Sequence, residues 1–139
     1  MCLMDTQHHI SDNVVYFISP LHRTNRNPDK SKWSISTTDE LKCFKNTYLN
    51  SWFLEDKGWG LILDSDNNIM ILGHTSSNER SQIARFENGN RNNVWHGYPW
   101  DRKENKDKPA ESILKIWVSK GYIDKSKMAK IRRCQLCNL

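Results

Sequence analysis

Histidine is the residue type in this chain best suited to acid–base chemistry, because its ordinary pKa lies near neutrality. Five histidines occur, at positions 8, 9, 22, 74 and 96. His96 lies within "VWHGYPWD" (94–101), among two tryptophans, a tyrosine, a glycine and a proline. Gly97 and Pro99 favour a turn there, and a turn anchored by Trp95 holds His96 in one orientation. We therefore expect His96 to be the leading catalytic residue.

The aromatic rings of 94–101 leave two roles open. Exposed rings of Tyr98 and Trp100 beside His96 suit stacking on nucleobases, which contributes about 1–3 kcal/mol per base. Buried rings instead form a hydrophobic plug where the chain crosses from the sheet to the C-terminal helices. We expect both arrangements together, with Trp95 buried and with His96 and Trp100 exposed.

His22 and His74 both precede a hydroxyl side chain by two positions, in "HRT" (22–24) and "HTS" (74–76). The pattern resembles the paired His-x-Thr/Ser motifs of the 2H phosphoesterases, in which two strands each present a histidine and a hydroxyl to one phosphodiester. The resemblance covers these two tripeptides, and it implies that His22 and His74 face one phosphodiester. Either His22 or His74 is the partner that we expect for His96 in acid–base catalysis.

The motifs of several other catalytic classes are missing from the sequence. It contains no glycine-rich phosphate loop, no Gly-x-Ser-x-Gly elbow and no His-Glu-x-x-His metal motif. Cys134 and Cys137 form one Cys-x-x-Cys pair. A tetrahedral zinc site needs further ligands, which Cys43 or a distant histidine would have to supply. We expect free thiols, no cofactor and no metal.

These features favour metal-independent chemistry on a phosphodiester, with histidine as acid or base and a guanidinium stabilising the developing charge. Small RNA-cleaving toxins use such chemistry, and the 2′-hydroxyl of their substrate supplies the nucleophile. For this chain we expect Arg85 or Arg23 as the anion ligand beside the histidines. The first hypothesis is therefore a small ribonuclease of toxin or phage-defence type.

The positive charge of the chain is concentrated at its C-terminal end. The net charge is +5, but residues 1–100 hold 10 basic and 11 acidic side chains, whereas residues 101–139 hold 11 basic and 5 acidic ones. Such asymmetry indicates an anionic partner, with RNA favoured among nucleic acids. The cations expected to contact it lie on the last predicted helix: Lys125, Lys127, Lys130, Arg132 and Arg133.

A second hypothesis comes from a different class of protein. The same cationic helix, together with the aromatic stretch 94–101, suits a non-enzymatic module that docks on an acidic protein, such as an antitoxin, an immunity protein or a phage factor. Catalysis requires two polar groups that converge on one phosphate, whereas docking requires none. The positions of His22, His74 and His96 relative to one another decide between the two hypotheses.

The elements that must position these residues are those of an α+β protein with a small, mainly antiparallel sheet. "TTDE" (37–40) is typical of a capping box with Thr37 as the N-cap, and it predicts a helix over about 38–50. Apolar runs on either side of "SDNN" predict a hairpin over about 59–74, and 81–87 predicts a further strand. Asp124 caps the second of two C-terminal helices. We expect these elements to share one core, including Leu63, Ile71 and Leu114.

The length predicts one domain over 1–139. Within it we expect residues 1–12 to be disordered and residues 101–108 to form a mobile loop. No apolar run approaches the roughly 20 residues that cross a membrane. The first residues show no basic segment followed by an apolar one. We therefore expect a cytoplasmic protein without a membrane partner.

The charge asymmetry generates a prediction about RNA binding. We expect Lys127→Glu, Lys130→Glu and Arg133→Glu together to abolish binding, since each lost phosphate contact also loses the release of counterions. The affinity of the unchanged protein for RNA should fall steeply with salt for the same reason. Fluorescence anisotropy at low salt measures both effects. An unchanged affinity of the triple variant would contradict the prediction.

Overall fold

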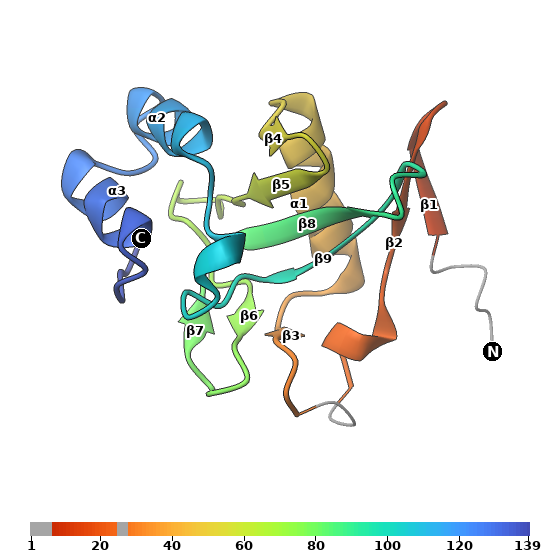
Figure 1. The fold of residues 1–139 in the computed structure, drawn as a ribbon, viewed down its shortest axis with the longest axis horizontal. Coiled ribbons are helices and arrows are strands. Elements are labelled where there is room, and N and C mark those ends of the chain that lie inside the picture. Colours follow the sequence, from red (N-terminus) through yellow and green to blue (C-terminus); the bar gives the residue numbers. More distant parts are fainter. Residues whose placement is uncertain (1–6, 25–27) are drawn as a thin grey trace.

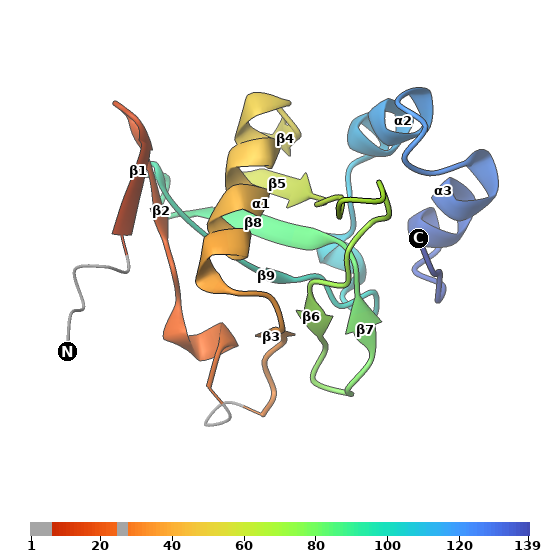
Figure 2. The same cartoon turned by 180° about the vertical axis from the view of Figure 1, so that it is seen from behind.

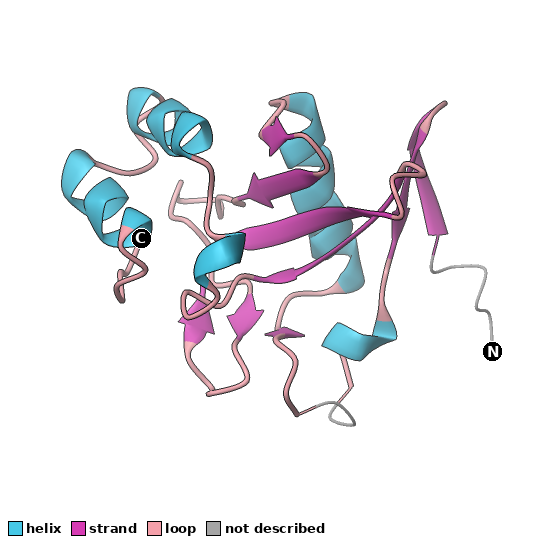
Figure 3. Cartoon of the chain, in the orientation of Figure 1, coloured by secondary structure: helices cyan, strands magenta, loops and turns pink. Residues whose placement is uncertain are grey.

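The computed structural model describes residues 7–24 and 28–139, which have the α+β fold that the sequence predicts (Figure 1, Figure 3). Within these residues, three α-helices accompany a six-stranded and a three-stranded sheet. In spatial order, the larger sheet comprises β1 (Gln7–Ser11), β2 (Val14–Phe17), β9 (Val94–Pro99), β8 (Ala84–Gly89), β5 (Lys57–Gly60) and β4 (Phe53–Leu54). The smaller sheet comprises β3 (Lys32–Trp33), β6 (Gly73–His74) and β7 (Arg80–Ser81).

The strand β9 lies inside the larger sheet, where the sequence predicted a turn. It pairs antiparallel with β8 along its whole length and parallel with β2. Gly97 does not bend the chain. A Cβ at that position would lie 2.3 Å from the ring of Phe86, so glycine is needed for close packing against the neighbouring strand. Pro99 is the last residue of β9, and its missing N–H therefore interrupts no bond further inside the strand.

The predicted hairpin over 59–74 exists only near its turn. Leu63 and Ile69 form a single antiparallel bridge. The strands on either side then separate, because β5 joins the larger sheet between β4 and β8, whereas β6 joins β3 and β7. An apolar run indicates that a strand is buried but not which strand it pairs with. For this reason the predicted pairing of the two strands was wrong.

The helix α1 (Thr37–Leu49) covers one face of the larger sheet (Figure 2). Its N-cap is Ser36 rather than Thr37, since the Oγ of Ser36 accepts a hydrogen bond from the backbone N–H of Asp39 at 3.1 Å. The helix consequently begins one residue before the predicted start. Its buried side includes Cys43 and Phe44, which pack on residues of β2, β8 and β9.

The helices α2 (Glu111–Ser119) and α3 (Lys125–Arg132) follow the sheets, as predicted. Asp124 caps α3 through a hydrogen bond from the backbone N–H of Lys127 at 2.8 Å. Gly121, with a φ of 78°, ends the preceding segment in the left-handed conformation that glycine favours. No helix of the described residues is long and apolar enough to span a membrane.

The buried apolar side chains form two clusters rather than the single core that the sequence suggested. One cluster lies between α1 and the sheet, and the other joins α2 and α3 to the far end of β5 and β8. Leu114 belongs to the second cluster, whereas Leu63 and Ile71 are exposed. The divergence of the predicted hairpin explains both exposed residues, because its outer part leaves the sheets.

The residues 7–11, which we expected to be disordered, form β1 through pairing with β2. Their polar sequence resembles that of a free terminus, yet an edge strand needs few buried side chains because its partner supplies the backbone hydrogen bonds. The rest of the predicted disordered segment includes residues 1–6, which lie outside the described residues.

Glu40 is a fully buried carboxylate at the base of α1. Its Oε2 accepts a hydrogen bond from the hydroxyl of Tyr16 at 2.6 Å, and its Oε1 lies 2.7 Å from a guanidinium nitrogen of Arg23. Arg23 also donates to the backbone carbonyl of Ile35. Burial raises the pKa of Glu40, and the bonds from Tyr16 and Arg23 offset part of that rise. The pair therefore links α1 to β2 and to the segment that follows His22.

Removal of one partner of this ion pair should be strongly destabilising. We expect Arg23→Met to lower the free energy of unfolding by about 3–5 kcal/mol, because it leaves the carboxylate of Glu40 buried without a cation. The double variant Arg23→Met with Glu40→Gln should recover most of that loss. Chemical denaturation measures both.

A surface ion pair provides the matched control for Arg23. Arg91 is 85% exposed and lies 3.1 Å from Asp56, so Arg91→Met should cost no more than about 1 kcal/mol. Equal losses in Arg23→Met and Arg91→Met would contradict the structural role of the buried pair.

Candidate acid–base site

The face of β8 and β9 that points away from α1 carries four polar side chains. Glu87 lies opposite His96, and Arg85 lies opposite Tyr98, in the antiparallel register of the two strands. Residues two positions apart share a face of a strand, so all four project from the same side. Their neighbours Ala84, Phe86, Trp95 and Gly97 point to the buried side. We call the side with the polar residues the open face.

Two short 3-10 turns flank the open face. They are η2 (Pro20–His22) and η3 (Asn105–Asp107), and they lie on the side of the sheet opposite α1 (Figure 1). The space between them is a cleft of about 560 Å³, which is lined by residues of both turns and of the open face. His22, Glu87, His96, Tyr98 and Asp107 all line this histidine cleft.

His22 forms part of one wall of the histidine cleft. Its Nδ1 lies 2.9 Å from the backbone carbonyl of Ser31, and a carbonyl can only accept, so Nδ1 carries a proton. The neutral ring therefore presents its other nitrogen, Nε2, as an unprotonated base. The ring stacks on that of Tyr98, with centroids 4.9 Å apart. Burial lowers the pKa of His22, the hydrogen bond to Ser31 opposes this shift, and the positive charges of His96, Lys30 and Lys32 add to it.

His96 and Glu87 form a histidine–carboxylate pair at the floor of the cleft. The Nε2 of His96 lies 3.7 Å from the Oε2 of Glu87, and about a third of each side chain is exposed. Burial lowers the pKa of His96, and the carboxylate of Glu87 opposes this shift. Protonation of His96 therefore depends on Glu87. His22 and His96 both line the histidine cleft.

A buried network fixes the other wall of the cleft. The hydroxyl of Tyr98 lies 3.0 Å from a carboxylate oxygen of Glu87 and 3.3 Å from one of Asp107. Arg85 lies beneath them, 3.3 Å from Glu87 and 3.5 Å from Asp107, with its guanidinium over the ring of Trp59. Burial raises the pKa of Tyr98, and the carboxylates of Glu87 and Asp107 raise it further, so this hydroxyl stays protonated and donates.

The segment 101–108 was expected to be a mobile loop, but the structure attaches it to the sheet. The backbone carbonyl of Asp107 accepts hydrogen bonds from the indole of Trp59 at 2.9 Å and from Arg85 at 3.3 Å. The sequence run is charged, and its charges suggested solvent exposure. Asp107 instead turns its carboxylate towards Arg85 and Tyr98, so the segment becomes a wall of the histidine cleft.

The charge of the histidine cleft is mixed, with an excess of carboxylates. Lys30 and Lys106 are its basic residues, and they lie with five acidic ones: Asp29, Glu87, Asp101, Glu104 and Asp107. Arg85 offsets part of the charge of Glu87 and Asp107. With neutral histidines the cleft favours cations. Protonation of His96 adds a positive charge, which makes the cleft more favourable to an anion.

His74 lies outside the histidine cleft, in an adjoining hollow of about 330 Å³. Its Nδ1 lies 2.9 Å from the hydroxyl of Ser34. His22 and His74 thus line different cavities, and the two tripeptides that resemble the 2H phosphoesterase motifs do not face one site. His96 shares the histidine cleft with His22. Of the two partners that we expected for His96, the structure therefore places His22 in the same cleft and His74 outside it.

The arginines expected as anion ligands are engaged with carboxylates. Arg23 contacts Glu40, and Arg85 contacts Glu87 and Asp107 with only 3% of its side chain exposed. Trp100, which we expected to be exposed for base stacking, is 6% exposed in the second cluster. Its place after the last residue of β9 turns the ring inward. Of the tyrosine and tryptophan rings of 94–101, only that of Tyr98 therefore lines the cleft.

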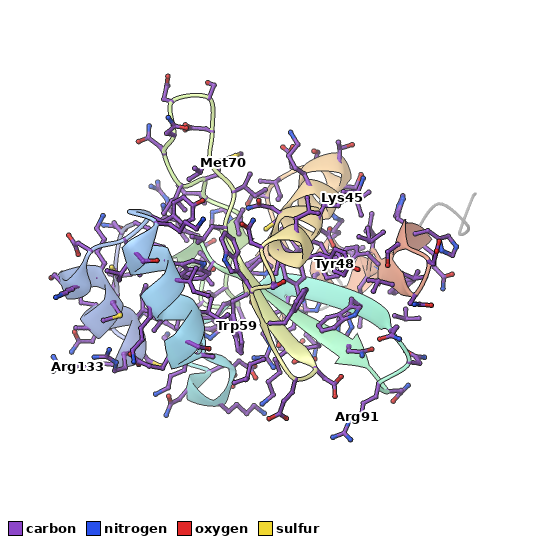
Figure 4. All side chains as sticks on the ribbon, turned by 90° about the horizontal axis from the view of Figure 1, so that it is seen from above. Lys45, Tyr48, Trp59, Met70, Arg91 and Arg133 are labelled. Atoms are coloured by element: carbon purple, nitrogen blue, oxygen red, sulfur yellow. The ribbon has the colours of Figure 1, made fainter. Side chains whose placement is uncertain are left out.

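The cationic residues of the last helix do not line the cleft, although the end of α3 contacts the segment around η3 through a hydrogen bond from Lys108 to the backbone carbonyl of Arg132. In Figure 4, Arg133 lies at the outer edge of α3, well apart from Trp59, whose ring packs against Arg85. Arg132 forms a close ion pair with Glu111 at 2.6 Å, and the ammonium of Lys127 donates to the backbone oxygen of Leu139. Lys125, Lys130 and Arg133 are exposed and form no ion pair within the described residues.

Glu87 and Asp107 are candidate site residues that sequence reasoning missed. Glu87 follows Arg85 by two positions in a predicted strand, and this alternation could have placed both on one face. Asp107 gave no comparable signal, because it lies in a charged run. Its role depends on the contact between η3 and the sheet.

Among the described residues, no three His, Cys, Asp or Glu side chains are grouped as a metal site would require. Cys43 is buried, and Cys134 and Cys137 are partly exposed free thiols. A scan against protein-family models finds no match, and comparisons with curated proteins and with solved structures find none either. The proposed function therefore depends on the geometry of the site alone.

Adjacent residues of β9 should separate stability from function. Trp95 is 7% exposed and packs against Phe44 and Phe53, so Trp95→Ala should lower the free energy of unfolding by about 3 kcal/mol or more. His96→Ala should change the melting temperature little, because its ring lies on the open face. Thermal and chemical denaturation measure both. A His96→Ala variant that melts as low as Trp95→Ala would identify the histidine as a core residue.

Proposed function

We propose that the protein cleaves RNA by acid–base catalysis in the histidine cleft. The observation that carries the proposal is the convergence of His22, His96 and Glu87 on one cavity from three different elements. Two titratable groups that reach one phosphate are what phosphodiester cleavage needs. RNA suits this arrangement because its own 2′-hydroxyl is the nucleophile, and no nucleophilic side chain is then required.

The geometry distinguishes the roles of the two histidines. His22 has its proton on Nδ1, so its Nε2 can accept the proton of the 2′-hydroxyl as the oxygen attacks phosphorus. His96, when protonated beside Glu87, can donate its proton to the departing 5′-oxygen as the P–O bond breaks. The products are a 2′,3′-cyclic phosphate and a free 5′-hydroxyl. Glu87 is a positioning residue, because it stabilises the imidazolium.

The basic groups nearest to the reacting phosphate are those that line the cleft. Lys30 and Lys106 can balance part of the charge on the phosphate. Arg85 acts indirectly, since it is buried and orients Glu87 and Asp107. Because the cleft otherwise holds an excess of carboxylates, the charge on His96 contributes both to binding of the phosphate and to catalysis.

Loss of either histidine should abolish most of the activity. We expect His22→Ala and His96→Ala each to lower kcat/KM for a short fluorogenic RNA by about 100-fold or more. His9→Ala is the matched control, since His9 is exposed on β1, which β2 separates from β9, and does not line the cleft, and it should leave the rate unchanged. Mass spectrometry should detect the cyclic phosphate, and an RNA with 2′-O-methyl groups should not be cleaved.

The pH dependence follows from the two pKa shifts. The reaction requires neutral His22 and protonated His96, and both pKa values are lowered from the ordinary 6.5. The profile of kcat/KM against pH should therefore be bell-shaped, with its maximum below about 6.5. Glu87→Gln removes the charge that raises the pKa of His96, so the limb governed by His96 should move to lower pH. A profile that does not move would contradict the role of Glu87.

The experiments also identify the alternative function. If RNA is not cleaved and the protein instead binds an acidic protein through Lys125, Lys130 and Arg133, the docking hypothesis is supported and the ribonuclease proposal fails. The burial of Trp95 and Trp100 reduces the aromatic surface on which docking would depend. We therefore favour cleavage of RNA.

A further inference from the structure

The outer face of the smaller sheet carries a row of basic side chains. His74 on β6 pairs in register with Lys32 on β3 and with Arg80 on β7. Residues directly opposite each other project from the same face of a sheet. The alternate residues Trp33, Gly73 and Ser81 are also in register, and all three are buried. We call Lys32, His74 and Arg80 the cationic row.

The cationic row holds two permanent cations, Lys32 and Arg80, one on each side of His74. The carboxylate nearest to Arg80 in sequence, Glu79, is held by two hydrogen bonds from Arg102, at 2.9 and 3.0 Å. Arg80 is exposed and forms no ion pair within residues 7–24 and 28–139. An exposed guanidinium without a carboxylate partner among these residues favours an anionic ligand.

Two members of the row line a hollow that adjoins the histidine cleft. The hollow has a volume of about 330 Å³, and Lys32 and His74 lie in its wall with Thr75 and Asn78. The ammonium of Lys32 donates to the backbone carbonyls of Leu21 and Lys30, which fixes its direction. Lys30 and Ser76 line both the hollow and the histidine cleft, so the two cavities are neighbours.

The side chains around the hollow are those that recognise phosphate. Ammonium and guanidinium groups bind its charge, and hydroxyl, amide and imidazole groups donate hydrogen bonds to its oxygens. Adjacent strands are about 4.8 Å apart, so the row extends over roughly 10 Å. The proposed reaction centre holds an excess of carboxylates, whereas the hollow is lined by lysines and polar neutral groups.

We propose that the cationic row and its hollow bind the phosphates of the RNA chain next to the one that is cleaved. This inference rests on the proposed function of the histidine cleft, and it specifies a substrate that is a single strand with several phosphates. Attraction at the row offsets the repulsion between the RNA and the carboxylates of the cleft. The role of His74 is then to bind a phosphate rather than to transfer a proton.

Binding and cleavage should respond differently to loss of the row. In a His96→Ala background, we expect Lys32→Gln with Arg80→Gln to weaken binding of a single-stranded RNA about tenfold or more, as measured by anisotropy at low salt. The slope of log K against log salt should become shallower by about 1.4, or about 0.7 for each lost phosphate contact. Lys45→Gln with Lys115→Gln removes the same charge from other exposed surfaces and should have a smaller effect.

With His96 intact, the row should matter only for long substrates. We expect Lys32→Gln with Arg80→Gln to lower kcat/KM for a long RNA by about tenfold, while Arg80→Gln alone leaves kcat/KM for a dinucleoside monophosphate unchanged because that substrate has no neighbouring phosphate. Arg80→Gln alone is the second variant. Its exposed side chain can be replaced without loss of the bonds that Lys32 makes near His22, so its partial effect should appear even if the double variant folds poorly.

The outcomes separate this inference from the proposed function. If the double variant and Arg80→Gln bind and cleave long RNA no differently from the Lys45 and Lys115 control, the inference about the row is wrong, whereas cleavage by the unchanged protein still supports the histidine cleft. If the unchanged protein cleaves no RNA but loss of the row weakens binding with the expected change in salt slope, the ribonuclease proposal fails and the row remains an RNA-binding surface.

Discussion

The buried contact between Glu40, Arg23 and Tyr16 links the parts of the molecule on which the candidate site depends. Glu40 belongs to α1 and Tyr16 to β2, and Arg23 directly follows the turn that carries His22. A buried carboxylate tolerates only an arrangement that satisfies its charge, so this contact limits how the three elements can sit. Glu40 lies on the α1 side of the larger sheet and does not line the cleft. Through its contact with Arg23, it nevertheless fixes the position of His22 on the other side of the sheet.

The alternation along β8 and β9 divides the molecule into a part that folds and a part that carries the proposed chemistry. Phe86 and Trp95 pack beneath α1, whereas Glu87 and His96 face the cleft. Each functional side chain is adjacent in sequence to a buried anchor, and small movements of the anchor would displace it. Arg85 has a further role, because its guanidinium holds the two carboxylates that surround Tyr98. The cleft is thus oriented by packing below and by ion pairs at its edge.

Local signals in the sequence were sufficient for the fold class and for the helices. Asp124 identified the start of α3, and the capping box at 37–40 identified α1, because caps depend on residues close in sequence. The same reasoning failed for β9, since Gly97 and Pro99 favour turns unless a neighbouring strand supplies a ring such as that of Phe86. It selected His22 and His96 for the site by residue type. It could not show that His74 lines another cavity, or that Asp107 closes this one, because both depend on contacts between distant segments.

The parallel pairing of β2 with β9 has a consequence for how the molecule is made. Val15 pairs with Val94, so this part of the sheet joins residues about 80 positions apart. Contacts of such long range form slowly, because a large loop must close before they contribute. Synthesis of the intervening chain takes roughly 4–16 seconds at about 5–20 residues per second. During that interval, the wall that contains His22 already exists as nascent chain, while the strand that carries His96 does not. The two histidines therefore meet only late in synthesis, and a nascent chain held at an earlier stage lacks the cleft.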